Sequence, residues 1–171
     1  KVHQLLGDRK QAKVYIMKAY GLNPFPITRA FDQIRCLMAE LKVPITLCGL
    51  NAGLCSAECG YTHMPIEDMA MLRTLSNIEI YNPTDEVISK KLARETRGYP
   101  RPRIIRFDKS VRGSLYIEEP DFDKGFAVLG NLKEAELCII SSGCYTRELS
   151  RVCQEYKIKL IDLFKLPVND N

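Results

Sequence analysis

The sequence contains no tryptophan and only two histidines, and no two of its seven cysteines form a Cys-x-x-Cys pair. It has no run of the roughly 20 apolar residues that a membrane-spanning helix needs. The first residues lack the apolar core of a secretory signal peptide. Although the net charge is +4, there is no basic tract that would follow a phosphate backbone. We therefore expect no membrane or nucleic-acid partner, and a cytoplasmic localisation.

The odd number of cysteines favours free thiols in a reducing compartment over disulfides. Cys55 and Cys59 lie in a polar loop that also contains Glu58 and His63. Their Cys-x3-Cys-x3-His spacing matches no common zinc pattern, and no second ligand pair follows it. The spacing therefore predicts no metal site on this chain. The other cysteines have apolar surroundings and are expected to be buried: Cys36, Cys48, Cys138, Cys144 and Cys153.

The composition, with 46% hydrophobic and 27% charged residues, is typical of a folded globular protein. Segments with strand and helix spacing alternate along residues 1–110. Because the crossovers are long enough for parallel pairing, this alternation predicts an α/β domain with a parallel sheet and helices on both faces. Strands are expected at residues 44–48, 78–81 and 103–107, and helices at residues 12–20, 27–41, 66–75 and 86–95.

A polar and acidic stretch, residues 111–124, predicts a linker to a second unit at residues 125–171. The second unit has one helix pattern between strand patterns, and a single unit of this kind cannot close a core by itself. We therefore expect the second α/β domain to be incomplete. Its strands are expected at residues 126–129, 137–141 and 159–163, and its helix at residues 146–156.

The chain is organised around residues 43–83, which form a strand, a polar loop, a helix and a further strand. The loop, from Gly49 to Pro65, follows the carboxyl end of a strand, where open α/β sheets bind their ligands. It contains His63, which has two interpretations: a loop histidine satisfied by the backbone, or a functional group. Glu67 and Asp68 follow in the first helical turn, where the helix dipole alone would favour carboxylates.

Several separate motifs occur in the order that one family shows. They are Arg29-Ala30-Phe31-Asp32-Gln33-Ile34-Arg35, Asn51-Ala52-Gly53, Thr62-His63-x-x-Ile66-Glu67-Asp68-x-Ala70-x-Leu72-Arg73 and Tyr81-Asn82-Pro83-Thr84-Asp85. These motifs resemble the pyrimidine-binding domain of transketolase-type enzymes, and the segments after residue 125 resemble the start of that family's C-terminal domain. The resemblance implies a thiamine-diphosphate-binding, pyrimidine-type domain followed by an incomplete α/β domain.

The resemblance also implies an activity: a transketolase-like transferase that moves a two-carbon ketol unit between sugar phosphate-like substrates. Members of the family hold Mg²⁺ and the diphosphate in a separate domain with a Gly-Asp-Gly motif, which this sequence lacks. The chain thus resembles the C-terminal subunit of a split transketolase, active only with an N-terminal, diphosphate-binding partner subunit in an α2β2 assembly. Thiamine diphosphate and Mg²⁺ would be bound mainly through that partner.

The resemblance implies a role for several residues. His63 would be catalytic, either hydrogen-bonding the reacting sugar oxygen or moving a proton near the cofactor. Asn51 and Cys59 would bind substrate beside His63, although transketolases carry a His and an Asp at those places. Phe25 would stack on the cofactor, or else be a core residue, and Arg29 would bind cofactor or partner, or else begin a solvated helix.

One family feature is missing from the sequence. The Glu that activates the aminopyrimidine should precede the helix that contains Arg29, in a Gly-Ile-x-Glu-Gln type of motif that is not present. Either the protein is degenerate there, or the N-terminal part of the domain is abbreviated or omitted from this sequence. One alternative, within the same cofactor class, is a subunit similar to deoxyxylulose-phosphate synthase or to the beta subunit of 2-oxo acid dehydrogenases. Loss of the Glu would instead leave a non-catalytic subunit that scaffolds its partner.

Overall fold

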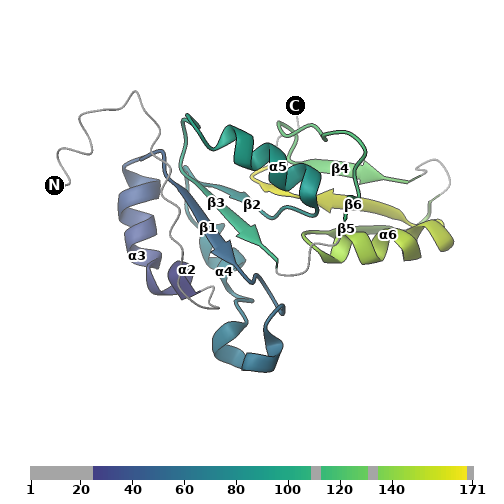
Figure 1. Ribbon diagram of the computed structural model, residues 1–171, viewed down its shortest axis with the longest axis horizontal. Helices are drawn as coiled ribbons and strands as arrows, with labels where there is room; N and C mark the ends of the chain where they lie inside the picture. Colours follow the sequence, from purple (N-terminus) through teal and green to yellow (C-terminus); the bar gives the residue numbers. More distant parts are fainter. Residues whose placement is uncertain (1–24, 109–112, 131–134, 169–171) are drawn as a thin grey trace.

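The computed structural model describes residues 25–108, 113–130 and 135–168, with side chains from residue 27 onward. Two sheets lie side by side along the long axis of the molecule (Figure 1). The expected helix at residues 12–20 lies outside the described part. No helix of the described ranges combines the length and the apolar character needed to cross a membrane.

The first sheet is mostly parallel, as the alternation of strands and helices predicts. Its strand order is β1-β3-β2-β7, in which β1 and β2 both pair parallel with β3, and β7 pairs antiparallel with β2. The strands are β1 (Thr46–Leu50), β2 (Glu79–Tyr81), β3 (Arg103–Phe107) and β7 (Lys165–Leu166). The last strand comes from the second unit, so the first sheet is completed by a segment distant in sequence.

Helices cover both faces of this sheet. Successive strand residues point to opposite sides, so each face carries apolar residues that pack against helices. Ile104 on one side belongs to a core cluster with residues of the helices before β1 and after the polar loop. Ile105 on the other side packs with Ile88 and Leu92 of α5. The helical segments are α2 (Phe25–Arg29), α3 (Phe31–Gln33), η1 (Ile34–Glu40), α4 (Asp68–Leu72) and α5 (Glu86–Glu95).

The helix expected at residues 27–41 is divided into three pieces, and the last, η1, is a π-helix. Its wider turn changes the spacing of the inward residues, so that Ile34, Met38 and Ala39 are buried. Leu37 and Leu41, which helical spacing places on the apolar face, are instead 45% and 47% exposed. The prediction of a single regular helix was therefore wrong.

The helix expected at residues 66–75 is shorter than the apolar spacing indicates, since α4 begins at Asp68 and ends at Leu72. The Ile66 N–H donates to the Met64 carbonyl at 3.0 Å and to the Glu67 side chain at 3.1 Å, so the backbone before Asp68 forms a turn rather than helix. Ile66 is accordingly 60% exposed rather than part of the core.

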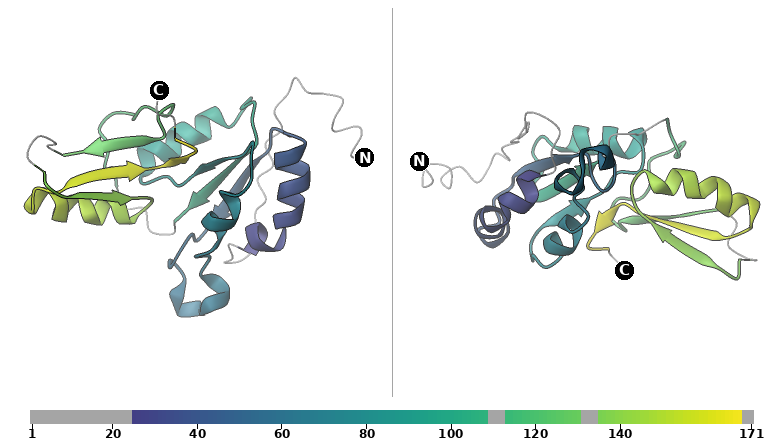
Figure 2. Two further views of the ribbon diagram at one scale, coloured as in Figure 1. Left: turned by 180° about the vertical axis from the view of Figure 1, so that it is seen from behind. Right: turned by 90° about the horizontal axis from the view of Figure 1, so that it is seen from below.

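The second sheet has the order β4-β6-β5, with β4 antiparallel and β5 parallel to β6. Figure 2 shows this sheet and α6 from behind and from below. Cys153 of α6 is buried, but Cys138 of β5 is exposed, so the expected burial of Cys138 was wrong. None of the seven cysteines forms a disulfide. The elements are β4 (Phe126–Leu129), β5 (Cys138–Ser141), α6 (Tyr145–Glu155) and β6 (Lys159–Leu163).

Buried carboxylates join the two sheets. Asp85 caps α5 by accepting from the Val87 and Ile88 N–H groups, and its second oxygen accepts from the N–H groups of residues 115 and 116. Asp162 of β6 accepts from Thr84 at 2.6 Å and from Tyr116 at 2.6 Å. These contacts fix the second unit beside the carboxyl end of β2.

Candidate functional site

Three strands of the first sheet end at the same edge, because β1 and β2 both run parallel to β3. A polar residue follows each strand: Asn51 after β1, Asn82 after β2 and Asp108 after β3. Open α/β sheets bind ligands at this carboxyl edge. The edge is therefore the candidate functional site of the described chain.

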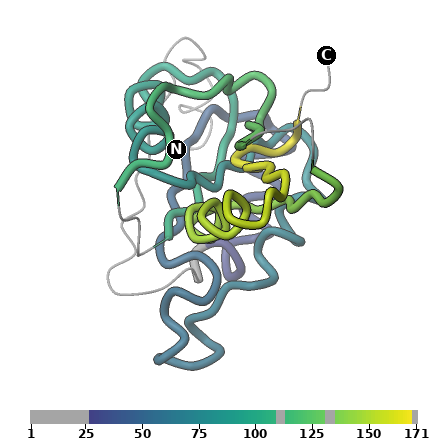
Figure 3. Tube along the Cα trace, turned by 90° about the vertical axis from the view of Figure 1, so that its right-hand side faces the viewer, coloured from purple at the N-terminus to yellow at the C-terminus, as the bar shows by residue number. Residues whose placement is uncertain are grey.

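The polar loop, expected from Gly49 to Pro65, spans residues 51–67 between β1 and α4 and projects from this edge. Figure 3 shows it extending beyond the rest of the trace. Its start is held by the Ala52 N–H, which donates to the Phe107 carbonyl of β3 at 3.1 Å. Asn51 there has φ +59, a left-handed conformation that asparagine adopts more readily than most residues. The loop contains two short 3₁₀ turns, η2 (Ala57–Cys59) and η3 (Tyr61–His63), joined by Gly60 at φ +83.

His63 is half-buried at the end of the second turn. Its N–H donates to the Gly60 carbonyl at 2.9 Å, which fixes the backbone. Its Nδ1 lies 3.0 Å from the Thr62 hydroxyl oxygen, and the tautomer decides which of the two groups donates. This hydrogen bond orients the imidazole ring within the loop.

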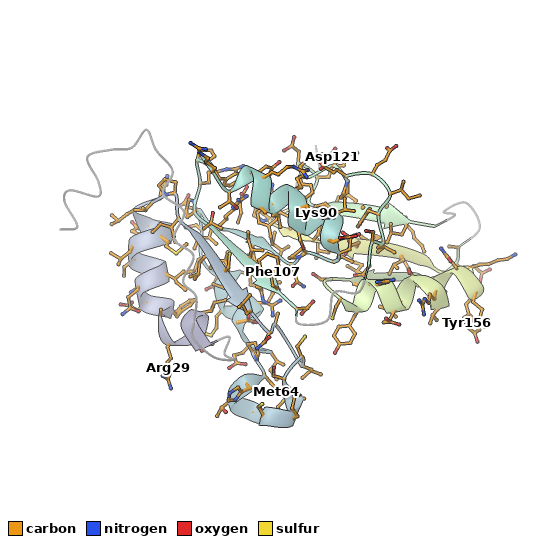
Figure 4. The ribbon with its side chains drawn as sticks, in the orientation of Figure 1. Arg29, Met64, Lys90, Phe107, Asp121 and Tyr156 are labelled. Atoms are coloured by element: carbon orange, nitrogen blue, oxygen red, sulfur yellow. The ribbon has the colours of Figure 1, made fainter. Side chains whose placement is uncertain are left out.

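Three of the predicted site residues lie in the polar loop, and the other two lie in α2. Cys59 and His63 lie in the two adjacent turns, with Cys59 exposed, and Asn51 lies half-buried at the base of the same loop. Arg29 ends α2, and Figure 4 shows its side chain pointing away from the ribbon. Phe25 begins α2, but its side chain lies outside the described part. The roles of all five residues remain predictions.

A buried ion pair fixes the end of the loop. The Arg106 guanidinium of β3 donates from Nε and from a terminal nitrogen to the two oxygens of Asp68, both at 2.8 Å. Asp68 is 1% exposed, and it also accepts from the Met69 N–H at 2.7 Å. The position of Asp68 in the first helical turn is thus explained by this ion pair as well as by the helix dipole. The bidentate geometry holds the first residue of α4 against the central strand.

Sequence reasoning missed a cluster at the same edge: Cys55, Asp108 and Cys144, all half-buried, have their ligand-type atoms within 4.8 Å of one another. The Cys55 thiol donates to one oxygen of Asp108 at 3.6 Å, and the Cys144 N–H donates to the other at 2.8 Å. Only the position of Asp108 directly after a parallel strand could have indicated the cluster. Neither Cys59 nor His63 belongs to it.

Known proteins resemble this chain in sequence and in structure. A family model described as "Transketolase, pyrimidine binding domain" matches residues 16–112. Transketolase of Mus musculus is 31% identical over 148 residues, which cover 81% of this chain and 23% of the mouse protein. One of the subunits of the apulose-4-phosphate transketolase of Phocaeicola vulgatus is 28% identical over 123 residues, which cover 70% of this chain and 38% of that protein. The chain thus spans less than a quarter of the length of the mammalian transketolases that it matches.

Solved structures show the same fold. A transketolase variant of Pichia stipitis superimposes with a TM-score of 0.77 at 20% identity, over 91% of this chain and 23% of that chain. A split-gene transketolase, described as an inactive beta4 tetramer, superimposes with a TM-score of 0.62 at 23% identity, over 81% of this chain and 46% of that chain. Because the family model covers more than half of the sequence, the chain belongs to the transketolase family, through its pyrimidine-binding domain.

Proposed function

We propose that this chain is the C-terminal subunit of a two-chain, thiamine diphosphate-dependent transketolase of the cytoplasm. It would act with an N-terminal subunit that carries the diphosphate and Mg²⁺ domain, in an α2β2 assembly, and transfer a two-carbon ketol unit between sugar phosphates. The observation that carries the proposal is the projecting loop with His63, at the carboxyl edge of the parallel sheet in a chain of this family.

The names of two similar proteins support a transketolase that is built from two kinds of subunit. The Phocaeicola vulgatus relative is named as one of the subunits of a transketolase, and one structural neighbour is a split-gene transketolase. The Pichia stipitis neighbour is described as a complex with fructose 6-phosphate, a sugar phosphate. We extend subunit composition and substrate class to this chain as part of the proposal.

The residues of the candidate site fit only one half of the cofactor. Mg²⁺ prefers carboxylate, amide, water and phosphate oxygens, whereas the three-ligand cluster of the described part contains two thiols. This cluster therefore does not fit Mg²⁺, and we propose that the partner subunit holds both Mg²⁺ and the diphosphate.

The loop and its base fit the other half, a flat and partly apolar ring that is covered by a partner. Leu50 ends β1 with 47% of its surface exposed, and Leu54 and Tyr61 of the loop are 51% and 70% exposed. We propose that these exposed side chains contact the partner or the ring. Phe25 and Arg29 of α2 are proposed to contact the ring or the partner.

When bound, thiamine diphosphate would supply the electron sink for transfer of the two-carbon unit. The chain's own contribution is to hold and move a proton at the sugar oxygen that changes charge during transfer. We assign this role to the His63 imidazole, which the Thr62 hydroxyl at Nδ1 orients.

Asn51 and Cys59 are proposed to contact the sugar on either side of His63. An asparagine is neutral, and a thiol is a weaker hydrogen-bond partner than a carboxylate. A site with these two residues would therefore favour a different sugar phosphate from a site with a histidine and an aspartate. This difference makes a panel of donor substrates necessary.

The test is to coexpress the chain with a partner that carries the Gly-Asp-Gly domain, and to add thiamine diphosphate and Mg²⁺. Ketol transfer is then followed from a panel of ketose phosphates to aldose phosphate acceptors. The proposal expects consumption of at least one donor with a matching acceptor product. A complex that binds the cofactor but consumes no donor would reject the transketolase function and favour a non-catalytic scaffold. Consumption of pyruvate with glyceraldehyde 3-phosphate, or of a 2-oxo acid alone, would instead favour the related activities.

A further inference from the structure

The cluster of Cys55, Asp108 and Cys144 has no role in the proposed transfer reaction. Each member comes from a different part of the chain: the polar loop, the end of β3 and the residue that precedes α6. We propose that these three side chains form a binding site for a thiophilic divalent cation of the zinc class. The proposal does not depend on transketolase activity, because the chain itself supplies the three ligands.

One of the three ligand–ligand distances matches zinc geometry, and the other two are close to it. With Zn–S of about 2.3 Å and Zn–O of about 2.1 Å, tetrahedral geometry requires a sulfur–oxygen separation of about 3.6 Å and a sulfur–sulfur separation of about 3.8 Å. Cys55 Sγ lies 3.6 Å from Asp108 Oδ1, which is the required separation. All three ligand atoms lie within 4.8 Å of one another, so side-chain shifts of about 1 Å or less complete the geometry.

The surroundings of the cluster orient its ligands. Cys144 precedes the 11-residue helix α6, whose N-terminal dipole favours negative charge. The Cys144 N–H donates to Asp108 Oδ2 at 2.8 Å and so orients the carboxylate while leaving Oδ1 directed at Cys55. Hydrogen bonds of this kind to a ligating group strengthen metal sites. Two thiolates with one carboxylate suit zinc and exclude Mg²⁺.

The position of the cluster gives the cation a structural consequence. Cys55 lies in the same loop as His63, and Asp108 follows β3, whose Arg106 holds the other end of that loop. Gly143 beside Cys144 is tightly packed, since a Cβ there would lie 2.7 Å from both Asn82 and Asp108 side-chain atoms. A bound cation would therefore fasten the loop to the junction between the two sheets. Three protein ligands leave the fourth tetrahedral position open to water or another donor.

The proposal is tested on the full chain, stripped of metal and kept under a phosphine reductant, by titration with Zn²⁺ against a chromophoric chelator. We expect one zinc ion per chain. Cys55→Ser and Cys144→Ser should each weaken binding by at least about 100-fold, because loss of a direct ligand exceeds the 10–100-fold effect of outer-shell changes. Asp108→Asn, which keeps an oxygen for the Cys144 N–H, should weaken binding by at least about 10-fold.

Matched controls decide between this site and other cysteines. Cys138→Ser, on exposed β5, should bind zinc as tightly as the unchanged chain. Cys59→Ser and His63→Ala should do the same; weakening by either to the level of Cys55→Ser would place the cation in the loop and overturn the proposal. A second readout is the melting temperature, which zinc should raise in the unchanged chain but not in Cys144→Ser. Binding that survives both Cys55→Ser and Cys144→Ser, or the absence of binding by the folded chain, would also overturn it.

Discussion

The ion pair between Asp68 and Arg106 provides the sharpest prediction of stability. Both side chains are almost fully buried, with 1% and 9% of their surface exposed, and they are joined by two hydrogen bonds of 2.8 Å. In Asp68→Ala, the Arg106 guanidinium loses its carboxylate in an environment that water hardly reaches. Breaking a buried pair in this way costs about 3–5 kcal/mol. A folded domain has about 5–15 kcal/mol of stability in total, so the loss would be severe.

The chain contains a matched control for burial. Lys90 and Glu86 of α5 form an ion pair at 2.9 Å, but their side chains are 65% and 47% exposed (Lys90 is labelled in Figure 4). Because water already solvates both charges, Lys90→Ala should cost only about 0.5 kcal/mol. A third variant, Asp68→Leu with Arg106→Met, removes both buried charges and should recover most of the stability lost in Asp68→Ala.

The assay is equilibrium unfolding in urea followed by far-ultraviolet circular dichroism, since the chain has no tryptophan to serve as a fluorescent probe. Similar losses for Asp68→Ala and Lys90→Ala would refute the reasoning, because burial would then make no difference. Failure of the double replacement to recover stability would show that shape, rather than unpaired charge, explains the loss.

Three further predictions follow from the site and the junction between the sheets. In the reconstituted complex, His63→Ala should lower kcat by about 100-fold or more with circular dichroism unchanged, and Lys90→Ala should not; equal kcat values would remove His63 from the catalytic step. Asp162 is buried, and desolvation raises its pKa in the folded protein, so its ionisation opposes folding. The free energy of unfolding should therefore fall as the pH rises from about 4 towards and through that raised pKa, and this fall should be absent from Asp162→Asn. If the urea unfolding midpoints of the unchanged chain and of Asp162→Asn depend on pH in the same way, the prediction is contradicted. Asp85→Ala leaves four backbone N–H groups without their acceptor and should cost roughly 2–4 kcal/mol in urea unfolding, with a smaller loss in Asp85→Asn, which keeps one acceptor oxygen.

Local signals in the sequence were sufficient for the elements whose determinants are contiguous. The helix at residues 86–95 agrees with α5, because Asp85 caps it directly and its apolar residues keep the regular helical spacing. The strands at residues 103–107, 126–129 and 159–163 also have the expected bounds. The parallel sheet with helices on both faces was predictable because the crossovers between strands exceed the length of a hairpin.

The sequence motifs were sufficient to identify the family and to locate the candidate site in the chain. They did not predict how the side chains of the site are arranged. The sequence by itself indicated a loop with His63 at the carboxyl end of a strand, and the structure places it there. The proposed roles of Phe25, Arg29, Asn51 and Cys59 stay predictions, because they depend on a cofactor and a substrate that only a complex would position.

Only the tertiary structure decided which distant residues meet. A first-turn carboxylate is explained locally by the helix dipole, yet Asp68 is buried because Arg106, from a separate strand, lies opposite it. The grouping of Cys55 with Asp108 and Cys144, rather than with Cys59 and His63, follows from the loop, β3 and α6 meeting at one sheet edge. Spacing along the chain cannot give such contacts, because they depend on the packing of whole elements rather than on the conformation of neighbouring residues.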